Sequence, residues 1–170
     1  MSNQTEQSAH EASNPDATHL CRPVELRTPR LLLRQWKDDD LEAWATMNAD
    51  PAVRRFFPSV HTHIEALGEA GRIRASITQR GWGMWAVEVP GVHTFAGFVG
   101  LNIPGYEAPW MPAVEIGWRL APAAWHQGYA TEGAAAALLL RSTVRFGNKT
   151  GNVPKAGWNR SLGFRCARTP

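Results

Sequence analysis

With 170 residues, 44% of them hydrophobic, the chain is long enough for one domain with its own core and too short for two domains of ordinary size. The net charge of +3, from 18 basic and 15 acidic side chains, is small beside the clustered basic faces of nucleic-acid-binding proteins, so no nucleic-acid partner is predicted. The longest apolar run, 134–140, is too short to cross a bilayer, and no membrane partner is predicted.

Two features favour a reducing, cytoplasmic location. The N-terminal segment is polar and lacks the apolar stretch of a signal peptide. Cys21 and Cys166 are the only cysteines and form no CxxC pair, so neither a disulfide framework nor a cysteine zinc site is expected. We therefore predict a cytoplasmic protein with no metal centre.

The polar N-terminal segment also sets the predicted domain boundary. Ser, Asn, Gln, Glu and Asp dominate it, and its apolar residues show no period. We predict a disordered leader over 1–24 and a single domain over 25–170.

The first part of the domain predicts a strand and a short helix. The apolar run 31–33, after a Thr-Pro turn, indicates a buried strand within 26–36. Asp39 and Glu42 have the spacing of a capping box, which predicts a helix that ends near Asn48.

A longer helix and a β-hairpin are predicted next. Thr62 and Glu65 form a second capping-box spacing, which predicts a helix over 62–80. Apolar residues then alternate with a period of two over 85–89, a Pro-Gly turn follows, and a second strand is predicted at 95–101.

The most informative stretch is a third strand, 113–120, that leads through a loop of small residues into an alanine-rich helix over about 131–145. Free N–H groups at a helix N-terminus carry a positive partial charge, so such a loop can hold a phosphate or pyrophosphate. Gly128 and Ala130 are small where an anion needs a close approach. Neither the Walker A pattern nor GxGxxG is present, which disfavours nucleoside-triphosphate and dinucleotide loops of those kinds.

These segments resemble a known family. The runs EIGWRLAP at 115–122 and WHQGYATE at 125–132 are similar to the acetyl-CoA-binding core of the GNAT acetyltransferases. With LRTPRLLLR at 26–34, they resemble more narrowly the branch that includes the ribosomal-protein N-terminal acetyltransferases, and the resemblance covers about 25–145. It implies an α/β (α+β) fold with a mixed, mostly antiparallel central sheet flanked by helices on both faces.

The resemblance also implies acetyl-CoA as co-substrate, with the pantetheine arm beside the third strand and the pyrophosphate on the loop, both held mainly by backbone groups. The cofactor-binding residues that it implies are Ile116, Trp118, Arg119, Leu120, Trp125, His126, Gln127, Gly128, Tyr129, Ala130, Thr131 and Asn152.

Acetyl transfer to an amine requires a neutral nucleophile and a polarised thioester carbonyl. Glu115 is the candidate catalytic residue, because a carboxylate on this strand can accept the amine proton directly or through water. The alternative, a structural carboxylate paired with an arginine, stays open, and no general acid is assigned. We expect an N-acetyltransferase that acts by direct attack of a primary amine, on a protein N-terminus or a small molecule.

The C-terminal part departs from the family pattern over 147–170. Asn152 keeps its spacing to the Leu-Gly-Phe run at 162–164, but Lys155 stands where the branch often has serine, and 146–152 is too short for the expected strand. Two alternatives follow: a catalytically impaired CoA-binding or interaction module on the same fold, or a binder of another phosphate ligand. A homodimer that covers the shortened sheet edge is a further open alternative.

Overall fold

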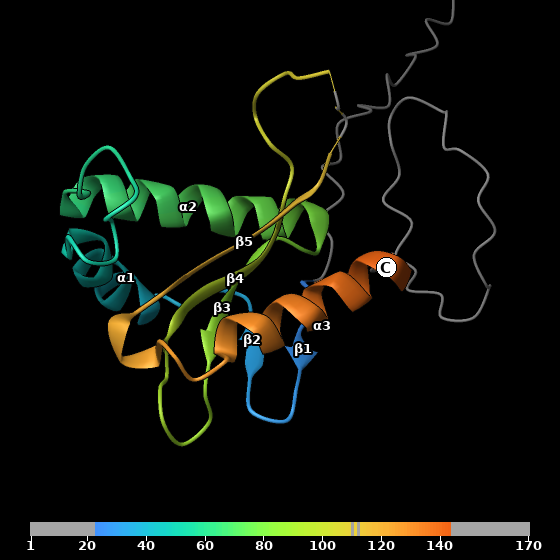
Figure 1. The fold of residues 1–170 in the computed structure, drawn as a ribbon, viewed down its shortest axis with the longest axis horizontal. Helices are drawn as coiled ribbons and strands as arrows, with labels where there is room; N and C mark the ends of the chain where they lie inside the picture. The colour runs from blue at the N-terminus through green and yellow to red at the C-terminus, as the bar shows by residue number, and fades with distance from the viewer. Residues whose placement is uncertain (1–22, 110, 112, 144–170) are drawn as a thin grey trace, which may run out of the picture.

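The computed structural model describes residues 23–143 except 110 and 112, and the strands in this part form one antiparallel sheet in chain order (Figure 1). None of the helices in these residues is long and apolar enough to span a bilayer. The elements are β1 (Leu26–Arg27), β2 (Leu32–Arg34), α1 (Asp40–Ala49), α2 (His63–Arg80), β3 (Met84–Glu88), β4 (Gly97–Asn102), β5 (Glu115–Leu120), the 3-10 helix η1 (Pro122–Ala124) and α3 (Tyr129–Thr143).

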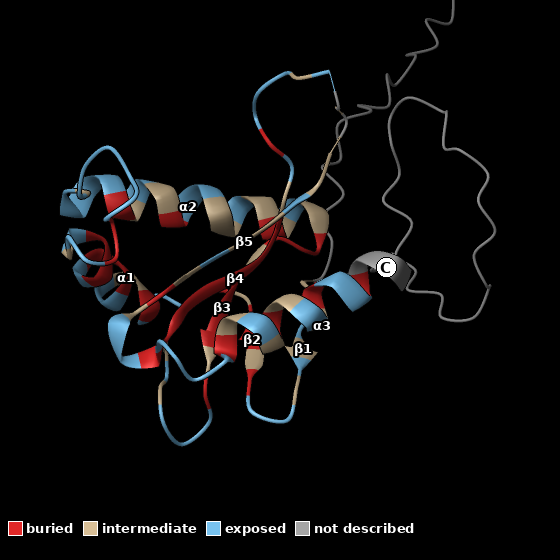
Figure 2. Cartoon of the chain, in the orientation of Figure 1, coloured by how far each residue is buried: buried red, intermediate tan, exposed pale blue. Residues whose placement is uncertain are grey.

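Helices cover both faces of the sheet. Helices α1 and α2 enclose one core, in which Trp44 and Ile77 pack against Phe98 of β4. Helix α3 covers the other core, which contains Trp85 of β3 and Val99 of β4. These two central strands are largely buried (Figure 2). The predicted architecture of a mainly antiparallel sheet between helices is therefore confirmed, and all the strand pairs in the described part are antiparallel.

Several predicted elements agree closely with the structure. The capping box at the start of α2 is formed, because the Thr62 side chain accepts from the backbone N–H of Glu65 and the Glu65 carboxylate accepts from Thr62. Strands β3 and β4 form the expected hairpin, and the third predicted strand is β5. Helix α3 begins at Tyr129, two residues before its predicted start.

The predicted strand over 26–36 is instead a hairpin of two short strands, β1 and β2. The backbone N–H of Thr28 donates to the carbonyl of Leu31 at 3.0 Å, and the Leu31 N–H donates to Thr28 Oγ1 at 2.8 Å. These two bonds close a tight turn around Pro29, a residue that cannot donate to a continuing strand ladder.

The predicted capping box at Asp39 is wrong. Asp39 makes no side-chain cap hydrogen bond. The start of α1 is fixed by Asp40, whose carboxylate accepts from Arg34 at 2.8 and 2.9 Å and from the Lys37 N–H at 2.7 Å. A buried ion pair between β2 and the first turn of α1 thus replaces the local cap.

Ordered contacts begin within the predicted leader. The Val24 N–H donates to the Gly81 carbonyl at 2.8 Å, and the Val24 carbonyl accepts from Trp85 Nε1 at 2.7 Å. Residues 1–22 of that leader lie outside the described residues, as does the whole of the atypical C-terminal part, 147–170.

Candidate active site

Strand β5 presents its alternate residues to the two faces of the sheet. Ile116 and Leu120 belong to the core under α3. Arg119 reaches the opposite face, where its guanidinium carbon lies 5.4 Å from the centre of the Phe98 ring. Since side chains alternate along a strand, Glu115 shares the α2 face with Arg119. Strand β5 is also the last strand in the described sheet, so no other described strand pairs with its outer edge.

A tight loop joins β5 to α3. Trp125 anchors it, because its Nε1 donates to the Leu120 carbonyl at 2.7 Å. His126 and Gly128 both adopt left-handed backbone conformations, with φ of 59° and 78°. The first intrahelical bond closes when Glu132 N–H donates to the Gly128 carbonyl at 3.0 Å. The N–H groups of the first turn therefore have no partner within α3, which is the arrangement that favours an anion.

A pocket of about 360 Å³ lies at this junction of strand, loop and helix. All of its lining residues except Ala124 were predicted to bind the cofactor. The full lining consists of Trp118, Leu120, Ala124, Trp125, His126, Gly128, Tyr129, Ala130 and Thr131. The structure thus gathers most of the sequence-predicted residues around one cavity. Trp118 leaves 55% of its surface exposed there.

Three predicted residues lie elsewhere, and a fourth is not described. Ile116 packs against the core. Gln127 offers its backbone carbonyl to Arg30. Arg119 points to the other face of the sheet. Asn152 lies outside the described residues.

The turn between β1 and β2 holds this loop in place. Arg30 donates from Nε to the Glu132 carboxylate at 2.6 Å and from Nη1 to the Gln127 carbonyl at 2.9 Å. Thr28 Oγ1 donates to Glu132 at 2.6 Å. The Arg30 guanidinium carbon also lies 4.9 Å from the centre of the Tyr129 ring. Sequence reasoning placed Arg30 only within a strand and gave Glu132 no role.

The Glu132 carboxylate is held in its charged form. Burial alone raises the pKa of this group, but the hydrogen bonds from Thr28 and Arg30 outweigh burial and set the pKa below its ordinary value. The carboxylate therefore serves the loop as an anionic anchor at neutral pH.

The side chain of Arg119 has a structural role. Its guanidinium donates to Glu69 at 3.0 and 3.3 Å and to Asn48 Oδ1 at 2.6 Å. It also lies over the rings of Trp44 and Phe57. The side chain is 9% exposed, so any contact of this residue with the loop pocket is left to its backbone.

Glu115 is exposed at the start of β5, where its carboxylate accepts from Asn102 Nδ2 at 2.8 Å. Among the described residues no arginine forms an ion pair with it. Tyr129 is buried under Arg30, and Tyr106 is exposed.

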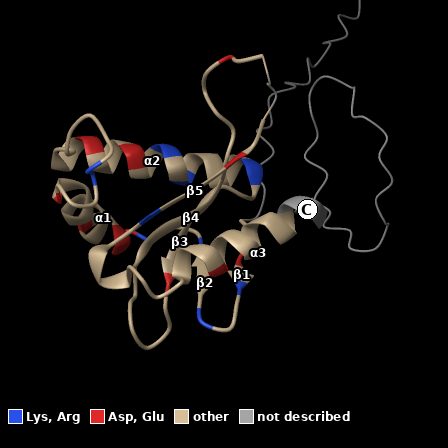
Figure 3. Ribbon diagram, viewed as in Figure 1, with Lys and Arg blue, Asp and Glu red and all other residues tan. Residues whose placement is uncertain are grey.

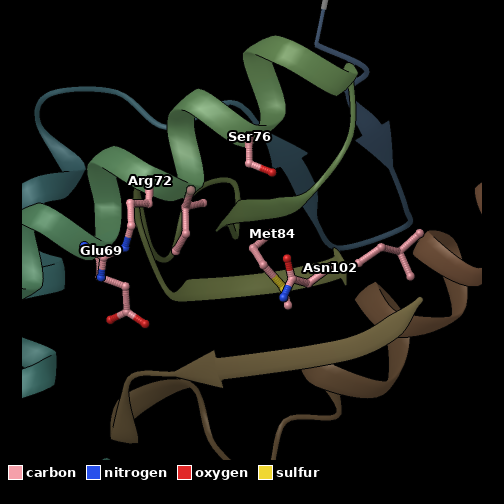
Figure 4. A pocket seen from close by; sticks show the side chains of 7 residues that line it. Glu69, Arg72, Ser76, Met84 and Asn102 are labelled. Carbon is pink, nitrogen blue, oxygen red and sulfur yellow. The ribbon is translucent and has the colours of Figure 1, made fainter. Parts of the chain in front are cut away.

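A second pocket, of about 210 Å³, lies between α2 and the strands (Figure 4). Its polar residues come from α2 and from the end of β4. The lining residues are Glu69, Arg72, Ile73, Ser76, Met84, Leu101 and Asn102. Asn102 joins this pocket to Glu115, since the same side chain lines the cavity and donates to that carboxylate.

The histidines near the start of α2 engage different acids. His61 Nδ1 lies 3.5 Å from Glu69, and His63 Nε2 lies 3.1 Å from Glu42. Within residues 23–143, apart from the gaps at 110 and 112, no three His, Cys, Asp or Glu side chains gather as metal ligands.

Comparisons with known proteins identify the family. The sequence model of the acetyltransferase (GNAT) domain matches residues 30–156. An acetyltransferase from Agrobacterium tumefaciens str. C58 is 26% identical with a TM-score of 0.56, and a GNAT-family acetyltransferase from Bacillus anthracis is 23% identical with a TM-score of 0.54. Each match covers 68% of this chain and 64% of the other.

A third structure is RimL, a ribosomal L7/L12 alpha-N-protein acetyltransferase in complex with coenzyme A. It is 18% identical, its TM-score is 0.54, and the match covers 71% of this chain and 68% of that one. At that identity the likeness concerns the fold alone. The family match itself spans most of the chain and includes β5, the loop and α3, so the chain belongs to the GNAT acetyltransferase domain family.

Proposed function

We propose that the chain is an acetyl-CoA-dependent N-acetyltransferase that transfers the acetyl group to a primary amine by direct attack. The observation that supports this most strongly is the pocket at the β5–α3 junction, which is lined by the residues that the family resemblance assigns to the cofactor. The alpha-N-protein activity in the name of RimL supports a protein N-terminus as one acceptor class, and a small-molecule amine is the other.

The loop suits the pyrophosphate of acetyl-CoA. The first-turn N–H groups of α3 supply donors and a positive partial charge. Gly128 leaves room for close approach, since a Cβ built there lies 3.4 Å from Arg30 Nη2. The guanidinium of Arg30 lies beside the loop as an ion pair with Glu132, so the net charge of that pair is zero and the N–H groups carry the attraction for the anion.

The outer edge of β5 suits the pantetheine arm. That arm contains two amides, and amides pair with the free N–H and C=O groups of an unpaired strand edge as a peptide does. Trp118 adds an exposed apolar surface on the same side as the loop pocket. When bound, acetyl-CoA supplies an acyl group activated as a thioester.

Glu115 is proposed to accept the proton of the acceptor amine. A protonated amine has no lone pair for attack, so a carboxylate near the acceptor makes the nucleophile available. Asn102 donates to one oxygen of Glu115, which orients the carboxylate and leaves its other oxygen without a hydrogen-bond partner among the described residues.

The cofactor proposal is tested by calorimetric titration of the chain with acetyl-CoA and CoA. The variant Gly128→Asp places a negative charge in the loop, and we expect it to weaken binding at least tenfold. Gly91→Asp is the matched control, because Gly91 has nearly the same backbone conformation, with φ of 77° against 78°, and lies in the turn after β3. Equal effects of the two substitutions, or no binding by the folded wild type, would refute the loop assignment.

The catalytic part is tested separately by following release of free CoA thiol in the presence of amines. Acetylation of an amine supports the enzyme. Tight binding of acetyl-CoA without transfer to any amine supports the non-catalytic CoA-binding module instead.

A further inference from the structure

We infer that the acceptor amine carries a carboxylate, which Arg72 binds in the pocket between α2 and the strands. This inference rests on the proposed acetyl transfer and names the substrate class for it. Arg72 supplies an exposed cation at the edge of that pocket, and the proposed proton acceptor Glu115 lies beyond the Asn102 end of it.

The pocket is built by one stripe of α2. Glu69, Arg72, Ile73 and Ser76 follow the spacing of three and four residues that places side chains on the same side of a helix. Figure 4 shows this stripe above Met84 of β3 and Asn102 of β4. The arginine is exposed to solvent and borders the open side of this pocket.

The charge of Arg72 is not neutralised within the described residues. The carboxylate nearest along the stripe, Glu69, is already bound by Arg119 at 3.0 Å. Arg74, two positions along the helix, is paired with Asp38 at 2.7 Å. No acidic side chain of the described structure forms an ion pair with Arg72, and α2 carries its acids in the first half and its arginines in the second (Figure 3).

An unpaired guanidinium beside neutral polar groups selects a carboxylate. Its planar donors match the two oxygens of a carboxylate, and Ser76 and Asn102 add neutral hydrogen-bonding groups to the cavity. A ligand with its carboxylate on Arg72 directs the remainder of the molecule toward Asn102 and Glu115. The acceptor that fits is therefore an amine joined to a carboxylate by a short chain.

Two sources offer this chemistry: a free amino acid-like compound, or a peptide with an acidic residue beside its N-terminus. The experiment uses matched acceptors that differ only in charge. One pair is γ-aminobutyrate and its amide, and the other is a peptide beginning Ser-Asp and one beginning Ser-Asn. Release of CoA thiol gives kcat/KM for each acceptor, and the pair that is acetylated identifies the source.

For the wild type we expect the charged member of a pair to be preferred by up to about fivefold in kcat/KM, as an ion pair with an exposed arginine gives. Arg72→Gln should abolish the preference by lowering kcat/KM for the charged member alone, and Arg72→Lys should retain part of it. Arg74→Gln is the control, because it removes an equal charge from the same helix outside the pocket, and it should keep the preference.

Equal turnover of both members by the wild type, or a preference that survives Arg72→Gln, would overturn the inference and leave N-acetylation standing. Failure of the folded chain to acetylate any of the four acceptors, while other amines are acetylated, would overturn the inference and leave the proposed function standing; failure with every amine tested would overturn both.

Discussion

Arg30 donates a hydrogen bond from Nε to the Glu132 carboxylate at 2.6 Å, and so joins the turn after β1 to the first turn of α3. The backbone N–H of Arg30 donates to the same carboxylate at 3.0 Å. The loop proposed to hold a pyrophosphate is therefore positioned by the side chain of Arg30, which lies about a hundred residues earlier in the sequence. Changes at this contact are expected to act on stability and on cofactor binding together.

Glu132→Gln is expected to lower the free energy of unfolding by about 1–2 kcal/mol, because it weakens charge-assisted hydrogen bonds from Thr28 and Arg30. The affinity for acetyl-CoA should fall several-fold as the loop loosens. Chemical denaturation and calorimetry measure the two effects. Glu25→Gln is the control, since its only ion pair in the described part, with Arg27 at 3.8 Å, is exposed and should contribute almost nothing.

The same contact predicts a dependence of stability on pH. The pKa of Glu132 is below its ordinary value of 4.5, and so is that of Glu88, which the hydrogen bond from Arg34 lowers. Both contributions are present above pH 4.5 and are lost as the pH falls through the lowered pKa values, because the unfolded chain then binds more protons than the folded chain. Denaturation curves from neutral to acidic pH should show this loss, and Glu132→Gln should reduce its slope. Identical slopes would contradict it.

Glu115→Gln tests the proposed proton acceptor. It should lower kcat for amine acetylation by about a hundredfold near neutral pH and leave the affinity for acetyl-CoA unchanged. The loss should shrink as the pH rises, because solvent then deprotonates more of the amine. Glu107→Gln is the control for loss of an exposed carboxylate in the preceding loop, and it should keep wild-type kcat. A Glu115→Gln enzyme with wild-type kcat would exclude the role.

His126 sits in a left-handed conformation, with φ of 59°, at a position where a glycine is less strained. His126→Gly should therefore stabilise the chain slightly, by up to about 1 kcal/mol. His126→Val should destabilise it, since a β-branched side chain is poorly accommodated there. Thermal unfolding of both variants checks the order, and a glycine variant less stable than the valine variant would contradict it.

Substitution of Arg119 distinguishes a structural role of its side chain from a role in binding the cofactor. Arg119→Met should cost about 3 kcal/mol of stability, because it leaves Glu69 largely buried without its partner. The double variant with Glu69→Gln should recover part of that loss. Acetyl-CoA affinity measured on folded protein should stay near the wild-type value in both variants, and a large loss of affinity would show that the side chain itself serves the cofactor.

Local chemistry made part of this structure predictable. The capping box at Thr62, the hairpin of β3 and β4 and the small-residue loop before α3 all depend on residues close together in sequence. The family resemblance predicted, in addition, most of the residues that line the pocket at the loop. The positions of Gly128 and Tyr129 in that pocket follow directly from the motif.

The remaining features depend on pairs distant in sequence. Nothing local to Arg30 indicates Glu132, and nothing at Asp39 reveals that Asp40 is already engaged by Arg34. The pocket with Arg72 likewise arises only when α2 packs over the end of β4. Such contacts are set by tertiary packing, which a single sequence does not display.

The alternation along β5 makes the register of this strand more important than its individual side chains. Insertion or deletion of one residue within Glu115–Leu120 would exchange its two sides, turning the aromatic surface of Trp118 toward α2 and the carboxylate of Glu115 toward α3. Single substitutions in β5 leave the pocket at the β5–α3 junction and the pocket between α2 and the strands in place, whereas a shift of one position disrupts both pockets. The strand thus tolerates changes of composition far better than changes of length.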